Sequence, residues 1–151
     1  MAVQLVTAGG GNDLLLQTKF VEITGNAINT GPEVDLLSIT ITPKSANSVF
    51  IVHFTFTGDQ TAGANNRICL FRLFAGLTGS EVEQEETYAR GDTTIGHECD
   101  GAFISQRVAA AGAGEHTIKV TWDAVSSTWE VRPDTEPDFE HASLLVMEID
   151  G

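Results

Sequence analysis

The sequence predicts an all-β domain built as an antiparallel sandwich or barrel. Two observations lead to this prediction. Short runs rich in Val, Ile, Thr and Phe recur along the chain, and clusters of Gly, Asn, Asp, Ser and Pro separate them. No segment sustains an apolar repeat of helical period, and Gly112 and Gly114 favour a turn in the Ala-rich stretch 108–116.

Eight of these runs are predicted as strands: 19–23, 36–42, 49–57, 67–75, 101–108, 115–122, 128–132 and 142–149. The second run shows the pattern clearly, because Ile39 and Ile41 alternate with polar residues before Pro43 ends the strand. The bridge "KSANS" then turns the chain into the third run. In 115–122 and 128–132, Trp122 and Trp129 continue the apolar faces and are predicted as core residues.

Two strands are apolar on both faces. In 142–149, Leu145 and Met147 alternate with Leu144 and Val146, and 67–75 shows the same property. In a monomeric two-layer sandwich the outward face of each strand should be polar, so we expect identical subunits to cover part of the surface. The alternative is a central strand under a long loop. The candidate subunit interface comprises Leu144, Val146, Cys69, Phe71 and Leu73.

The composition limits the partners that the chain can have. Its 151 residues fit one domain, and 21 acidic residues against 8 basic ones give a net charge of −13. Binding to nucleic acid or to anionic lipid requires basic residues that neutralise phosphates, so we expect neither partner. No apolar run is long enough to span a membrane, and no signal peptide precedes the first strand, which suggests synthesis in the cytosol.

No motif indicates catalysis, and we expect neither an enzyme nor a cofactor. The chain has no nucleophile elbow, P-loop or dinucleotide fingerprint. In "HECD", His97 and Cys99 can share one face of a strand, but no second pair of metal ligands accompanies them. The acidic stretches 81–86 and 134–140 lack the register of a calcium-binding loop. Cys69 is predicted to be a buried free thiol, with a Cys69–Cys99 bridge as the less favoured alternative.

Four segments resemble, in the same order, segments of small virion domains of tailed bacteriophages, found in capsid decoration proteins and fibre tips. They are "LLSITITPKSANSVFIVHFTF" at 36–56, "CLFRLFAGLTGSEV" at 69–82, "GEHTIKVTWDAVSSTWEV" at 114–131 and "ASLLVMEI" at 142–149. The stretch 3–23 stands where these domains have their opening strands. The chain departs from the pattern at Ile118, where the family has Tyr, and after Arg72, where its Gly is displaced.

The resemblance implies a two-sheet jelly-roll sandwich of about 8–10 strands, similar to the trimeric tumour necrosis factor and complement globular-head class. It implies a homotrimeric knob that ornaments the virion surface by docking on the major capsid protein. In this reading residues 17–151 form the domain and residues 1–16 a contact arm. The candidate docking residues in the arm are Val3, Leu5, Leu14, Leu15 and Leu16.

The alternative implied by the same resemblance is a component of a tail or head fibre, whose tip binds a receptor or a host glycan. Its recognition loops would be 57–66 or 81–92. The two readings differ in location on the virion and share the fold.

Overall fold

The computed structural model describes residues 3–6, 15–62, 67–92, 98–99, 101–125, 127–133 and 140–151, and for 3–6, 92 and 98–99 it describes the backbone. These residues contain strands and no helix. The strands are β1 (Val3–Val6), β2 (Leu15–Glu22), β3 (Ala27–Asn29), β4 (Val34–Ile41), β5 (Ser48–Thr57), β6 (Asp59–Ala62), β7 (Arg67–Leu77), β8 (Val82–Asp92), β9 (Glu98–Cys99), β10 (Ala102–Ala109), β11 (His116–Asp123), β12 (Thr128–Val131) and β13 (His141–Asp150).

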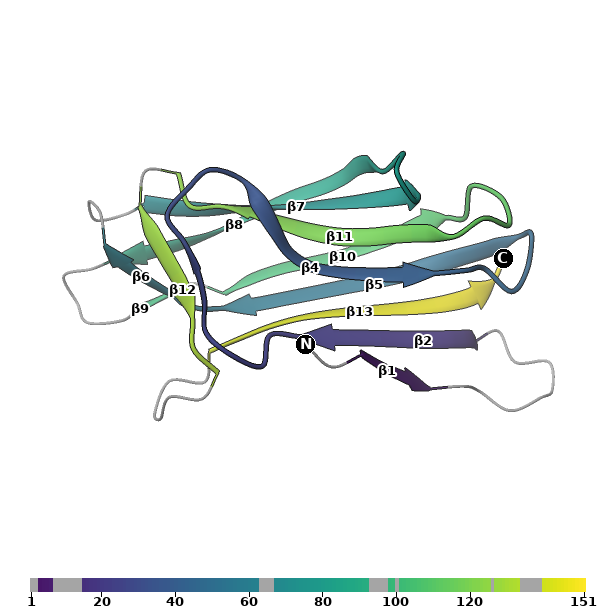
Figure 1. The fold of residues 1–151 in the computed structure, drawn as a ribbon, viewed down its shortest axis with the longest axis horizontal. Helices are drawn as coiled ribbons and strands as arrows, with labels where there is room; N and C mark the ends of the chain where they lie inside the picture. The colour runs from purple at the N-terminus through teal and green to yellow at the C-terminus, as the bar shows by residue number, and fades with distance from the viewer. Residues whose placement is uncertain are drawn as a thin grey trace.

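Two five-stranded antiparallel sheets pack face to face (Figure 1). One sheet has the order β1-β2-β13-β5-β10, and the other has the order β4-β11-β7-β8-β9. A third, small sheet of β3-β12-β6 crosses one end of the sandwich (Figure 1). The prediction of an all-β antiparallel fold is therefore confirmed.

Aromatic side chains fill the space between the sheets. The ring of Phe71 in β7 lies 4.4 Å from that of Phe56 and 5.4 Å from that of Phe54, both in β5, between ring centroids. Trp122 and Trp129 pack on the same cluster, each with its ring centroid 6.3 Å from that of Phe56. All five side chains are buried, which confirms the core prediction for both tryptophans.

Side chains from one sheet cover the backbone at the edge of the other. The amide of Gln17 in β2 donates to the carbonyl of Thr42, just past β4, at 2.8 Å, and the ammonium group of Lys19 donates to the carbonyl of Thr40. At the opposite side, the amide of Gln106 in β10 donates to the carbonyl of Gln84 in β8 at 3.4 Å. These contacts satisfy polar groups at sheet edges, where unpaired backbone would otherwise recruit other strands.

All eight predicted strands occur, and two further segments differ from what the sequence suggests. Residues 82–92 of the stretch 81–92, expected as a loop, form strand β8, which pairs with β7 along nearly its whole length. The division at residues 16 and 17 cuts through β2, and β1 pairs with β2 so that Val3 stands opposite Val21. Residues 3–6 and 15–16 therefore belong to the main sheet. The glycine-rich stretch between them lies outside the described residues.

Candidate interaction surface

The five residues predicted for a subunit interface lie inside the protomer. Leu144, Val146, Cys69, Phe71 and Leu73 each have 0% of their surface exposed. Pairing between strands explains this, because Leu144 stands opposite Phe54 and Val146 opposite Val52, both on the core face of β5. The prediction of these residues as an interface is therefore wrong, since a buried side chain offers no surface to a partner.

The opposite face of the same strands is also apolar and points away from the core. Successive residues of a strand point to opposite faces, so Leu145, Met147 and Ile149 of β13 face outward. Leu145 is paired with Phe20 of β2 and with His53 of β5, and Met147 with Ile51 of β5. We call this surface the apolar face; it comprises Phe20, Ile51, Phe103, Leu145, Met147 and Ile149.

The apolar face ends at an exposed aromatic side chain. Phe103 in the edge strand β10 is 57% exposed. Its ring stacks on that of His53, with centroids 6.2 Å apart and planes inclined by 23°. The charged side chains on this face lie towards its margins, at Glu22 where β2 ends and at Arg107 in β10. The centre of the sheet thus presents carbon and neutral polar atoms to its surroundings.

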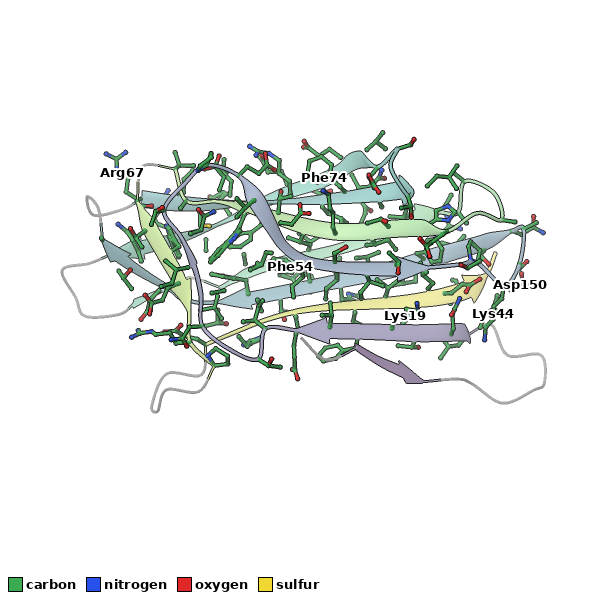
Figure 2. The ribbon with its side chains drawn as sticks, in the orientation of Figure 1. Lys19, Lys44, Phe54, Arg67, Phe74 and Asp150 are labelled. Atoms are coloured by element: carbon green, nitrogen blue, oxygen red, sulfur yellow. The ribbon has the colours of Figure 1, made fainter. Side chains whose placement is uncertain are left out.

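The outward face of the other sheet carries ion pairs in addition to exposed apolar side chains such as Tyr88 in β8, which is 55% exposed. Arg72 of β7 lies 3.1 Å from Glu33 and 2.7 Å from Glu86 of β8, between side-chain nitrogen and oxygen atoms. Lys119 of β11 lies 2.9 Å from Asp35 of β4. Figure 2 shows Phe54 between the layers and Phe74 near the outer surface of this sheet. Partly exposed ion pairs of this kind are typical of a surface that meets water.

The two outward faces therefore differ in what they can contact. Apolar side chains gain about 25 cal/mol for each Å² removed from water, and a contiguous apolar patch on one side of a domain is typical of an interaction site. Covering the ion-paired face would also take the charges of Arg72, Glu33 and Lys119 out of water, which costs free energy that the apolar face does not have to pay. The apolar face is therefore the candidate interaction surface of the domain.

Of the five docking residues predicted in the arm, the structure describes the side chains of Leu15 and Leu16. Leu15 and Leu16 are half-buried at the start of β2, where Leu15 stands opposite Ile149 of the apolar face. Val3 and Leu5 lie in β1, for which the structure describes the backbone, and Leu14 lies outside the described residues. Leu15 and Leu16 thus extend the sheet that carries the apolar face.

The loops predicted for recognition are also partly strand. Of the stretch 57–66, residues 59–62 form β6 in the small sheet, and residues 63–66 lie outside the described part. Asp59 and Gln60 are buried rather than displayed. Residues 82–92 of the stretch 81–92 form β8, so the structure does not present them as a loop.

Within the described residues, no three His, Cys, Asp or Glu side chains are grouped to hold a metal ion. His97 and residues 134–139, both considered for metal binding, lie outside that part of the chain. Cys69 is a free, buried cysteine, as predicted. The described residues also include no helix with the length and apolar character needed to cross a membrane.

No family model matches the chain, and no curated protein matches it. The solved structures that are similar to it include two with low sequence identity. One is the structure of infectious bursal disease virus strain Gx, with 8% identity and a TM-score of 0.35, covering 99% of this chain and 36% of that one. The other is the enzymatically active domain of tailspike protein 4 from bacteriophage CBA120, with 10% identity and a TM-score of 0.31, covering 97% of this chain and 17% of that one. The chain thus spans well under half of each, and neither similarity carries an argument about its function.

Proposed function

We propose that this chain is a structural, non-catalytic protein of a tailed-bacteriophage virion, and that it decorates the capsid as a homotrimeric jelly-roll knob. The ordered resemblance of four segments to small phage virion domains supports this proposal. In this role the major capsid protein is the surface on which the knob docks.

The order of the strands supports the jelly-roll part of the proposal. The eight long strands are β2, β4, β5, β7, β8, β10, β11 and β13. We number these strands one to eight along the chain. Their order is then first-eighth-third-sixth in one sheet and second-seventh-fourth-fifth in the other. All but one of the connections between consecutive strands cross from one sheet to the other. Two facing four-stranded sheets connected in this way form a double Greek key, which is the jelly-roll arrangement.

The observation that carries the proposal is the contrast between the two outward faces. The apolar face places Leu145, Met147 and Ile51 side by side at the centre of one sheet, whereas Arg72 and Lys119 carry ion pairs on the other. Covering the apolar face with copies of the same chain removes carbon surface from water and leaves the charged face outward. A net charge of −13 then keeps neighbouring knobs apart.

The test is the mass of the purified protein by light scattering after size exclusion. We expect three times the monomer mass for the wild type and the monomer mass for Leu145→Asp, because a carboxylate at the centre of the apolar face must lose its hydration in the assembly. Leu70→Asp is the matched control, since Leu70 is a half-buried leucine on the outward face of the other sheet. We expect Leu70→Asp to remain a trimer.

A monomeric wild type, or a Leu145→Asp variant that stays trimeric, would contradict the assembly. Circular dichroism of each variant separates loss of assembly from loss of fold. The location on the virion is tested separately by counting copies in purified particles. Hundreds of copies support a capsid decoration protein, and a few dozen or fewer support the alternative of a tail or head fibre component.

A further inference from the structure

A hollow of about 360 Å³ lies on the ion-paired face, on the side of the molecule away from the apolar face. Strands β4, β7 and β11 form its floor, and Glu81 closes it from the turn before β8. A volume of this size is within the range of sites that hold small molecules. It remains accessible when the apolar face is covered, because the two faces belong to different sheets.

The polar groups around the hollow are already held in place by one another. Glu33 is paired with Arg72 at 3.1 Å and also accepts a hydrogen bond from the hydroxyl of Thr121. Asp35 is paired with Lys119 at 2.9 Å. The backbone N–H of Gly79 donates to Glu81 at 2.8 Å, and this bond contributes most to lowering the pKa of that carboxyl. The groups are therefore positioned before any ligand arrives, which reduces the entropy cost of binding.

The charges of the hollow disfavour an ionic ligand. An anion would meet the carboxylates of Glu33, Asp35 and Glu81. A cation would find two of these carboxylates already neutralised, because Glu33 is paired with Arg72 and Asp35 with Lys119, and it would meet the Lys119 ammonium group beside Asp35, the more exposed partner of that pair. A carboxylate in an ion pair keeps free lone pairs, and an ammonium group keeps further N–H donors. The arrangement thus offers acceptors and donors together to a neutral ligand.

The hollow also has an apolar part. The ring of Phe74 lies in its floor, with the Lys119 ammonium nitrogen 5.9 Å from the ring centroid. Val34, at the edge of the sheet, is 45% exposed and lines the same hollow. A ligand that matches this surface has carbon-bound hydrogens on one side and hydroxyl groups around its rim.

We propose that this hollow binds a neutral sugar ring, with its C–H face against Phe74 and Val34 and its hydroxyl groups on Asp35, Lys119 and Glu81. Hydroxyl groups donate to the carboxylates and accept from the ammonium group, so each sugar hydroxyl can use both of its hydrogen-bonding roles. This site goes beyond the structural role proposed above and does not rest on the trimer, because all its residues come from one protomer.

The test uses the full chain labelled with nitrogen-15 and titrated with methyl glycosides of glucose, galactose and mannose up to about 50 mM, which detects millimolar affinity. We expect saturable shifts of the amide signals of Val34, Asp35, Phe74 and Lys119 with at least one of these sugars. Asp35→Asn and Phe74→Leu should each weaken the binding at least about fivefold. Asp150→Asn, an exposed aspartate at the end of β13, is the matched control and should bind like the wild type.

N-acetylneuraminic acid serves as the anionic probe, and we expect it not to bind. The proposal is overturned if no neutral sugar gives saturable shifts, if the shifts fall elsewhere, or if both variants bind like the wild type. Tighter binding of the anionic sugar would also overturn it. The outcome is independent of the oligomeric state, so it separates this site from the assembly proposal.

Discussion

The backbone N–H of Lys44 donates a hydrogen bond to Oε1 of Glu148 at 2.6 Å, although 104 positions separate the two residues. The hydroxyl of Ser48 donates to the same oxygen, and the amide of Gln17 donates to the other. Glu148 is fully buried. One carboxylate on the last strand therefore holds the turn that joins β4 to β5 and also contacts β2.

Replacing Glu148 by Ala should lower the free energy of unfolding by about 3 kcal/mol, because three donors lose their acceptor inside the protein. Urea unfolding at one fixed protein concentration measures this loss.

Two variants accompany that measurement. Glu148→Gln keeps one acceptor oxygen and should lose less stability than Glu148→Ala. Glu22→Ala removes an exposed glutamate on neighbouring β2 and should change stability by no more than about 0.5 kcal/mol. A Glu148→Ala protein as stable as the wild type would show that the turn does not depend on this carboxylate.

Replacing Phe71 by Ala should cost about 3–5 kcal/mol, because its ring packs on Phe54 and Phe56 and the space cannot close fully. Phe103→Ala is the size-matched control, since Phe103 is 57% exposed and should cost less than about 1 kcal/mol within one protomer. Both are measured in the Leu145→Asp background, so that assembly does not contribute. Equal losses for the two variants would contradict the position of Phe71 in the core.

The sequence predicts the long apolar strands well because alternation with period two is a local signal. Strand β8 lacks that signal, since Glu83, Glu85 and Glu86 interrupt it. Its place depends on pairing with β7, where Arg72 binds Glu86 across the two strands. The short strands β3 and β6 lack the signal as well, and their places depend on distant partners. In β3, Asn29 is buried because its side chain donates to the carbonyl of Trp122, 93 positions away, at 2.8 Å. Such partners are invisible to a local pattern.

The sequence also indicates that β13 is apolar on both faces, but it does not tell which face is inside. Leu144 and Leu145 are equivalent in the pattern, and strand pairing decides between them. Leu144 pairs with Phe54 on the core face and Leu145 with His53 on the outward face. The polar His53, beside Ile51 and Thr55 in β5, was the available signal. Side chains that pair across neighbouring strands lie on the same face of a sheet. The face of β5 that carries the polar His53 is therefore also the face of β13 that carries Leu145.

The thiol of Cys69 should be unreactive in the folded protein. Burial, and to a lesser extent the charge of Asp123, raises the pKa of this thiol far above its ordinary value, so almost no thiolate forms. In a Cys99→Ser variant, which leaves Cys69 as the single thiol, reaction with Ellman's reagent at pH 8 should be at least about a hundredfold slower than in urea. Rapid reaction without denaturant would contradict the buried position.

Glu140 should make the protein less stable as the pH rises from about 4.5 towards neutrality. Burial raises the pKa of its carboxyl above the ordinary 4.5, and the charge of Asp59 adds to this, against the hydrogen bond from the backbone N–H of Arg132. The folded state therefore keeps the proton of Glu140 at pH values where the unfolded state has lost it. The tighter binding of this proton in the folded state adds to the free energy of unfolding. This contribution is fully present below about pH 4.5 and is lost as the pH rises through the raised pKa of Glu140.

Glu140→Gln removes this titration while keeping an oxygen that can accept from Arg132. Urea unfolding between pH 4 and about pH 7.5 compares the variant with the wild type, so that the titration of all other carboxyls cancels. We expect the stability of Glu140→Gln relative to the wild type to increase with pH across this range. Ser105→Ala, an exposed and non-titrating change, should run parallel to the wild type. If Glu140→Gln also runs parallel, or loses stability relative to the wild type as the pH rises, Glu140 does not hold its proton more tightly in the folded state.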